Sequence, residues 1–158
     1  MQFQSLFIFF YFGFFIGLIS AHETTKPEAQ KYFYLGQQYL QAGEIQSAVK
    51  AFKKAIKKDR KFAEAYYQLA VAFMKKGTIE GRMDATYALE KALQLQPKNI
   101  KYHLTMAHLL LKKDMKGAAR SRFKKVLKLD PKNAEAYFYL GLLKEKDMLW
   151  YKDMISPH

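Results

Sequence analysis

Apolar residues recur along most of this chain at spacings of four and three, which places them on one face of a helix. Three stretches share this pattern, and each is followed by a position that suits the end of a helix: Arg60, Pro97 and Pro131. Proline stops a helix because it lacks the amide hydrogen and clashes with the preceding turn. The three apolar sets are Ala48, Phe52 and Ala55; Ala85, Leu89 and Ala92; and Ala119, Phe123 and Val126. The pattern therefore predicts three similar helices.

A second apolar stripe precedes each of these helices, and a fourth copy begins near the end of the chain. The stripes are Tyr32, Leu35, Gly36 and Tyr39; Tyr66, Leu69, Ala70 and Phe73; His103, Met106, Ala107 and Leu110; and Tyr137, Leu140 and Gly141, with Lys144 in the last place. Each stripe contains a small residue, which lets two antiparallel helices approach closely. Turns between the partners are expected at Gly43, at Gly77 and Gly81, and around Asp114.

Pro97 and Pro131 are 34 residues apart (131 − 97), and a period in this range indicates a repeat architecture. The pattern resembles the tetratricopeptide repeat, a helix-turn-helix unit of about 34 residues. The resemblance covers residues 29–146. It implies an all-α fold, a right-handed superhelix of antiparallel helix pairs with about three repeats and a C-terminal capping helix.

The resemblance also sets the expected boundaries. These are repeat one at 29–62, repeat two at 63–99, repeat three at 100–133, and a capping helix and tail at 134–158. Repeat two is three residues longer than the family's unit, and we expect the excess in its turn. His103 stands where the other copies carry tyrosine, and Arg60 where they carry proline.

The tail from Lys144 onward mixes Lys and Asp with Met148, Leu149, Trp150 and Tyr151. The last repeat of a stack leaves one face open, which a terminal element of altered composition must cover. We interpret the tail as a cap with a short apolar flap. Contact of Trp150 with a ligand is the alternative.

In the tetratricopeptide family the first helices line a concave surface that commonly binds a peptide. The residues at the family's groove positions are Phe33, Gln37, Leu40, Tyr67, Val71, Met74, Leu104, His108, Leu111, Phe138 and Leu142. An aromatic and aliphatic floor with polar and basic rims suits an apolar or amphipathic segment. The resemblance thus implies a non-enzymatic scaffold that binds a peptide or helix of a partner protein. Coverage of the groove by the chain's own termini and self-association are left open.

Family members that bind the C-termini of heat-shock chaperones hold the ligand's carboxylate with Lys and Asn. The matching positions in repeats one and two carry Phe33, Gln37 and Gln68. Because Phe33 replaces the lysine and the asparagine is missing, this ligand is not expected.

Basic residues are concentrated on the second helices of the pairs, and the formal net charge of the chain is +13. The candidate basic face consists of Lys53, Lys54, Lys57, Lys58, Arg120, Lys124 and Lys125. Solvated helix faces would explain these charges. The alternative is a membrane or envelope assembly factor that contacts anionic lipid or polymer through this face. Nucleic acid is disfavoured, because the apolar segment at the start of the chain points to export, away from nucleic acid.

Residues 1–21 carry no charged side chain, and the stretch from Leu6 to Ile19 is almost entirely apolar and aromatic. This run fits a secretory signal peptide with Ala21 before the cut, although no Lys or Arg precedes it. A retained anchor and a buried core helix are the alternatives, and an anchor needs about 20 apolar residues. We expect a secreted, periplasmic or membrane-anchored protein, with a polar linker at residues 22–28.

Catalytic and metal chemistry find no support. The chain has no cysteine, which excludes disulfides and thiolate metal sites. Its histidines are His22, His103, His108 and His158. His103 and His108 are about 140° apart around a helix and share no face for a metal ion. The sequence has no glycine-rich phosphate loop. We therefore expect no enzyme activity, cofactor or metal.

Overall fold

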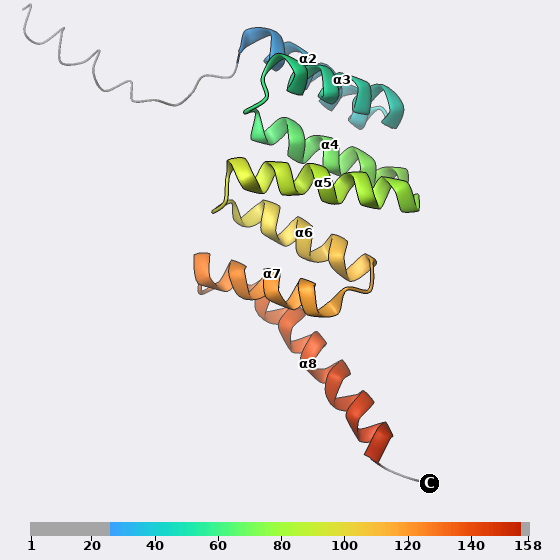
Figure 1. Cartoon of the computed structure of the whole chain (residues 1–158), viewed down its shortest axis with the longest axis vertical. Helices are drawn as coiled ribbons and strands as arrows, with labels where there is room; N and C mark the ends of the chain where they lie inside the picture. The colour runs from blue at the N-terminus through green and yellow to red at the C-terminus, as the bar shows by residue number, and fades with distance from the viewer. Residues whose placement is uncertain (1–25, 156–158) are drawn as a thin grey trace, which may run out of the picture.

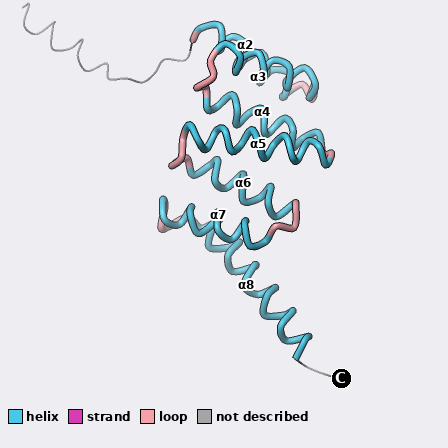
Figure 2. The backbone as a smooth tube through the Cα atoms, viewed as in Figure 1, coloured by secondary structure: helices cyan, strands magenta, loops and turns pink. Residues whose placement is uncertain are grey.

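The structure, a computed structural model, describes the backbone of residues 26–155 and the side chains of residues 26–145. This part of the chain contains seven α-helices and no strand (Figures 1 and 2). The helices are α2 (Pro27–Gln41), α3 (Ile45–Lys58), α4 (Ala63–Lys76), α5 (Ile79–Leu95), α6 (Ile100–Lys112), α7 (Lys116–Leu129) and α8 (Ala134–Ile155). The polar linker was expected to end at residue 28, but α2 already begins at Pro27, since proline suits the first turn of a helix.

The helices stack as antiparallel pairs, α2 with α3, α4 with α5 and α6 with α7, and α8 follows at the end of the row (Figure 1). The prediction of an all-α superhelix of helix pairs is confirmed. The second helices end where the pattern requires: α3 ends before Arg60, α5 before Pro97 and α7 before Pro131.

The turns within the pairs share a backbone feature. Gly43, Gly77 and Asp114 adopt positive φ angles of 78°, 74° and 56°, which reverse the chain after the first helix of each pair. Glycine adopts this region without the steric cost that a β-carbon brings. Asp114 is the non-glycine residue at this position, and aspartate is among the few residues that tolerate it.

The apolar sets of the second helices form the centre of the core. Phe52, Leu89 and Phe123 are fully buried at equivalent positions of α3, α5 and α7. The small residue of the first-helix stripe allows this packing at Gly36, where an added Cβ would lie 2.6 Å from Cε1 of Phe52. The predicted role of the small residues in helix contact is therefore confirmed at Gly36.

The fourth stripe behaves differently from the first three. Gly141 is exposed and no atom lies within 4 Å of a Cβ placed on it, and Tyr137 is 57% exposed. The close helix contact expected at Gly141 is wrong, because in the described part of the chain no second helix packs against α8 on this side.

The extra residues of repeat two lie in a helix, not in the turn as expected. Helix α5 has 17 residues, whereas α3 and α7 have 14 each. The extension is at the start of α5, where Thr78 Oγ1 accepts a hydrogen bond from the Gly81 amide over 3.0 Å. Gly81 is thus a buried helical residue, and a Cβ there would lie 2.7 Å from the Phe73 carbonyl oxygen.

The expected apolar flap is also wrong, because α8 continues without a break for 22 residues from Ala134 to Ile155. Its C-terminal half projects away from α7 (Figure 1). After Gly141 the sequence has no glycine or proline before Pro157, so nothing stops the helix earlier. Trp150 lies on this helix, and its side chain is outside the described part.

The predictions for residues 1–21, a signal peptide or an anchor, lie outside the described residues. Among the helices from residue 26 onward, none combines the length and hydropathy needed to cross a membrane.

Candidate partner-binding face

The predicted groove residues all lie on the first helices α2, α4 and α6 and on α8; we call this set the first-helix face. The structure places them in three classes of exposure. The buried members are Phe33 and Tyr67; the half-buried members are Gln37, Leu40, Val71, Met74, Leu104, His108 and Leu111; the exposed members are Phe138 and Leu142. The floor that the sequence suggested is therefore built unevenly along the stack.

Phe33 belongs to the core between the first two repeats. Its ring lies 5.9 Å from that of Phe52 on α3 and 4.8 Å from that of Phe62 just before α4, measured between centroids. With 6% of its surface exposed, Phe33 offers a partner little area. Its contribution is to hold the first pair against the second.

Tyr67 is similarly occupied, by contacts that join α4 to α6. Its ring stacks on Tyr102 at 4.9 Å and 17°, and Lys101 Nζ lies 4.4 Å from its centroid. The Tyr102 hydroxyl donates to Glu64 Oε2 over 2.8 Å. Burial and the Glu64 carboxylate both raise the pKa of Tyr102, so its hydroxyl stays protonated and remains a donor.

Sequence reasoning missed Tyr102, although it is among the largest fully buried side chains. The equivalent positions of repeat two and of α8 carry Ala65 and Ala136. A large aromatic residue where repeat two and α8 have alanine is the signal that could have revealed a contact specific to the junction of repeats two and three.

His108 joins α6 to α7 and α8. Its Nε2 lies 2.6 Å from Glu135 Oε1, and its ring meets Tyr139 edge-on at 4.7 Å and Phe123 at 5.7 Å. Tyr139 and Phe123 stack in parallel at 5.1 Å. The His108 ring is therefore largely engaged by its own chain, and α8 is fixed to the last pair through its first turns.

Phe138 and Leu142 continue the first-helix face onto α8. They lie four residues apart and are 61% and 37% exposed. Residues at this spacing are neighbours on a helix surface. Together with the half-buried Leu104 and Leu111 of α6, they give the C-terminal half of the face more accessible apolar surface than the N-terminal half.

The candidate basic residues are divided between α3 and α7, and several are engaged within the chain. Lys53 and Lys54 lie over the rings of Phe73 and Tyr32 at 5.6 and 5.5 Å. An ion pair of 2.7 Å joins Lys58 to Glu28; it raises the pKa of Lys58 and lowers that of Glu28.

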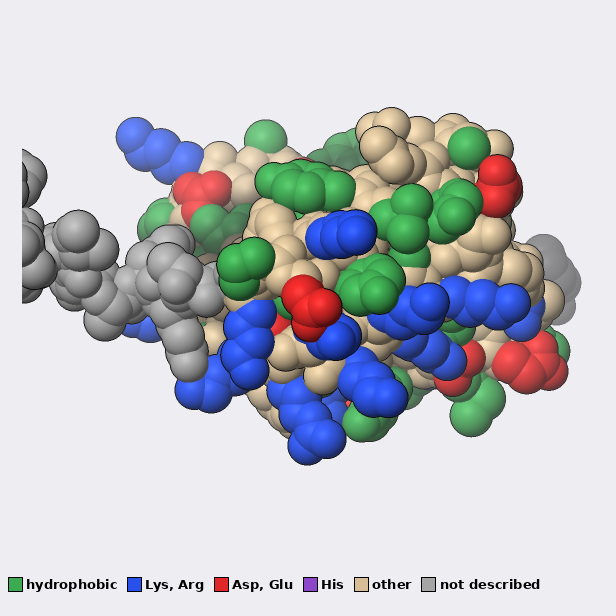
Figure 3. Space-filling model, turned by 90° about the horizontal axis from the view of Figure 1, so that it is seen from above, with side chains coloured by type: hydrophobic (Ala, Val, Ile, Leu, Met, Phe, Trp, Pro, Cys, Tyr) green, Lys and Arg blue, Asp and Glu red, His purple; other side chains and the backbone are tan. Residues whose placement is uncertain are grey.

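On α7, Arg120 donates to the Leu143 carbonyl over 3.3 Å, while Lys124 and Lys125 are exposed; Lys57 of α3 is exposed as well. Seen from the α2 end, most visible Lys and Arg side chains gather on one side of the molecule (Figure 3).

Metal binding finds no site in the region with described side chains. No group of three or more histidine or acidic residues there is arranged to hold a metal ion.

Two segments of the chain match family models of the same repeat. Residues 36–77 match a model described as TPR repeat, and residues 104–144 match one described as Tetratricopeptide repeat. The fold is a tetratricopeptide-repeat solenoid. The human protein "DnaJ homolog subfamily C member 3" is 32% identical over 122 residues, which is 77% of this chain and 24% of that protein. The solenoid thus spans about a quarter of the length of the curated relative.

Solved tetratricopeptide-repeat structures superpose on most of the chain. The first TPR of Spaghetti (RPAP3), bound to the HSP90 peptide SRMEEVD, has a TM-score of 0.69 at 17% identity, covering 80% of this chain and 98% of that one. The Yersinia enterocolitica type III secretion chaperone SycD, in complex with a peptide of the translocator YopD, also has a TM-score of 0.69, at 16% identity, covering 80% and 99%. At this identity the likeness establishes the fold.

Proposed function

We propose that this solenoid is a non-enzymatic scaffold that binds a peptide or an amphipathic helix of a partner protein along its first-helix face. The observation that carries the proposal is the row of half-buried apolar side chains on α4 and α6, which continues as exposed ones on α8. The row comprises Val71, Met74, Leu104, Leu111, Phe138 and Leu142. Partly exposed apolar side chains on consecutive helices leave surface that a partner can cover.

The titles of two similar structures support a peptide as the partner. Spaghetti and SycD are each described with a bound peptide. The ligand of this chain should nevertheless differ from a chaperone C-terminus. Phe33 is buried and uncharged, so it cannot supply the cation that would hold a carboxylate, and Gln68 already donates one hydrogen bond to Glu64 over 3.3 Å. An apolar segment with few charges is the better match.

The test is affinity capture with the full chain and with single charge insertions. Phe138→Glu and Leu104→Glu place a carboxylate on the apolar row, and each should weaken capture of a partner by about tenfold or more, since an unpaired charge would be buried at the interface. Phe138 is the safer position for folding because it is largely exposed.

Met83→Glu is the matched control: Met83 is 63% exposed but lies on α5, a second helix. The proposal requires that this variant capture the same partner as the unchanged chain. Full capture by Phe138→Glu and Leu104→Glu, with helical circular dichroism preserved, would show that another surface binds the partner.

We also propose that residues 1–21 send the chain out of the cytoplasm or hold it at a membrane. The length of this segment, its lack of charged side chains and the almost entirely apolar stretch from Leu6 to Ile19 support the idea. Sequencing the mature N-terminus after cell fractionation tests it. A mature chain that begins at Met1 and remains in the cytosolic fraction would contradict it.

A further inference from the structure

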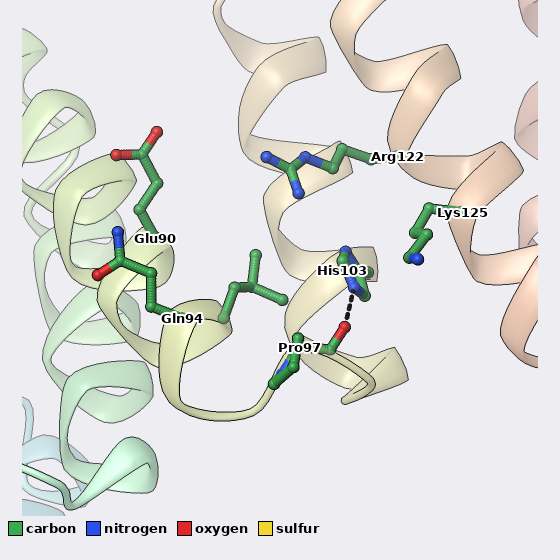
Figure 4. A pocket seen from close by; sticks show the side chains of 7 residues that line it. Glu90, Gln94, Pro97, His103, Arg122 and Lys125 are labelled. Carbon is green, nitrogen blue, oxygen red and sulfur yellow. Dashed lines mark hydrogen bonds between the residues drawn. The ribbon is translucent and has the colours of Figure 1, made fainter.

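A pocket of about 400 Å³ lies at the junction of repeats two and three, between the second helices α5 and α7. It is separate from the first-helix face. Its polar lining consists of Glu90, Gln94, the Pro97 carbonyl, His103, Arg122 and Lys125 (Figure 4). Glu90 and Gln94 come from α5, His103 from α6, and the two cations from α7.

The lining is specific to this junction. Tyr66 occupies the place of His103 one repeat earlier, and Ala88, nine residues before Pro97, occupies the place of Arg122, nine residues before Pro131. Two differences therefore distinguish this junction from the one before it: an imidazole in place of a larger phenol ring, and an added guanidinium.

The described residues do not neutralise the two cations of the pocket. Arg122 and Lys125 are three residues apart on α7, so they lie on one side of the helix. Within residues 26–145 neither forms an ion pair, and Glu90 on the opposite wall pairs with neither. The pocket lining therefore carries two positive charges and one negative charge.

His103 contributes an unsatisfied nitrogen beside these cations. It is 4% exposed, and its Nε2 lies 2.9 Å from the Pro97 carbonyl oxygen, which can only accept, so Nε2 carries the hydrogen. Nδ1 is buried and has no hydrogen-bond partner among the described residues. Burial, then Arg122 and Lys125, lower the pKa of His103, which keeps the ring neutral and leaves Nδ1 as an acceptor without a donor.

We propose that this pocket binds a phosphate group, either free or as the monoester of a small molecule. Arg122 and Lys125 supply charge-assisted donors to its oxygens, and guanidinium geometry suits phosphate. Inorganic phosphate retains a hydroxyl at neutral pH, and a phosphate monoester retains one in its monoanionic form. This hydroxyl is the donor that Nδ1 lacks. An ionised carboxylate has no hydroxyl to offer. Pockets of this volume hold whole small molecules. In a bound ester, the organic part would therefore contact Glu90 and Gln94 on the opposite wall.

The experiment follows the imidazole ring signals of the full chain by NMR while inorganic phosphate or O-phosphoserine is added at constant ionic strength. We expect saturable shifts of the His103 signal and a higher apparent pKa for this ring in the bound state, because the anion offsets the repulsion from Arg122 and Lys125. Tighter binding of O-phosphoserine identifies an ester as the ligand, and tighter binding of inorganic phosphate identifies the free ion.

Four variants separate a built site from general charge attraction. Arg122→Ala and Lys125→Ala should each weaken phosphate binding roughly tenfold, the value of one charge-assisted hydrogen bond. His103→Tyr, which restores the residue of the other repeats, should fill the pocket and abolish binding with the helical content unchanged. Lys124→Ala removes the same charge from the exposed surface of α7 and should leave binding unchanged.

Three results would overturn the proposal. One is a His103 signal that does not respond to either phosphate compound. The second is an equal loss of affinity in Lys124→Ala and Arg122→Ala. The third is acetate binding as tightly as phosphate, which would assign the pocket to carboxylates.

Discussion

The same substitution at two equivalent glycines should change stability in opposite directions. Gly36 and Gly141 occupy the same position of the first-helix pattern, on α2 and α8. A Cβ on Gly36 would lie 2.6 and 2.7 Å from two ring carbons of Phe52, whereas a Cβ on Gly141 meets no atom within 4 Å. Carbon atoms are in favourable contact at about 3.5–4.0 Å. Only the substitution at Gly36 therefore requires neighbouring atoms to move.

The expected magnitudes follow from two opposing effects. Alanine is favoured over glycine inside a helix by about 0.5–1 kcal/mol. Overpacking a filled core typically costs about 1–3 kcal/mol, and the Phe52 ring is fully buried and has little room to yield. Gly36→Ala should thus lower the free energy of unfolding by about 1–2 kcal/mol. Gly141→Ala should raise it by about 0.5–1 kcal/mol.

Urea denaturation monitored by circular dichroism measures both values, and thermal midpoints should shift by about 3–4 °C per kcal/mol. A double-mutant cycle with Phe52→Leu isolates the contact, because the smaller side chain makes room for the new methyl group. The combined variant should lose less stability than the sum of the two single changes. Unchanged stability of Gly36→Ala, or strict additivity with Phe52→Leu, would show that the α2–α3 contact is looser than described.

Three further predictions concern a turn, a buried hydroxyl and a titrating ring. Gly77→Ala should lower the free energy of unfolding by about 1 kcal/mol, because the left-handed backbone at φ 74° penalises a Cβ even in open space; Gly77→Asn should cost less, and equal costs would count against this reason. Tyr102→Phe should cost about 1–2 kcal/mol in the same urea assay, since Glu64 loses a hydrogen bond; no loss would mean that water replaces the hydroxyl. The pKa of His103 is lower in the folded chain than its ordinary value of 6.5, so the unfolded chain binds the proton more readily and stability should fall as the pH drops through about 6.5. Urea midpoints in phosphate-free buffer measure this fall, which His103→Tyr should reduce; an equal fall in that variant would assign it to other groups.

The sequence predicted those parts of the fold that depend on local chemistry and repetition. The spacing of Ala48, Phe52 and Ala55 and its two later copies defined the buried faces of the second helices, and Pro97 and Pro131 marked their ends. These features could be read because a helix face and a helix stop are both determined by nearby residues.

Features that depend on which helix packs beside a residue could not be predicted from the sequence pattern in the same way. Gly81 was expected in a turn, yet the Thr78 cap allows α5 to begin earlier. Tyr137 repeats the pattern of Tyr66 but is exposed, because its helix has no second helix beside it in the described part of the chain.

The candidate site shows the same division. The sequence pattern assigned the first-helix residues to the correct helices. It could not show that Phe33 and Tyr67 are buried in contacts between helices while Phe138 is exposed. Nor could it show that His103 and Arg122, on different helices, line one pocket. Both outcomes depend on contacts between different helices, and the spacing of residues along a single helix gives no information about such contacts.

The longer α5 helix shows where a repeat of this kind tolerates growth. The packing residues of α5 have the same spacing from Pro97 as their counterparts in α7 have from Pro131. The three added residues extend the opposite end of the helix, so they leave this packing unchanged. Near that end, Ile79 and Met83 are largely exposed. The start of a second helix is thus a permissive insertion point. A short epitope or a fluorophore-bearing turn placed between Gly77 and Thr78, which keeps the Thr78–Gly81 cap intact, should report on the assembled stack without disturbing either the first-helix face or the pocket.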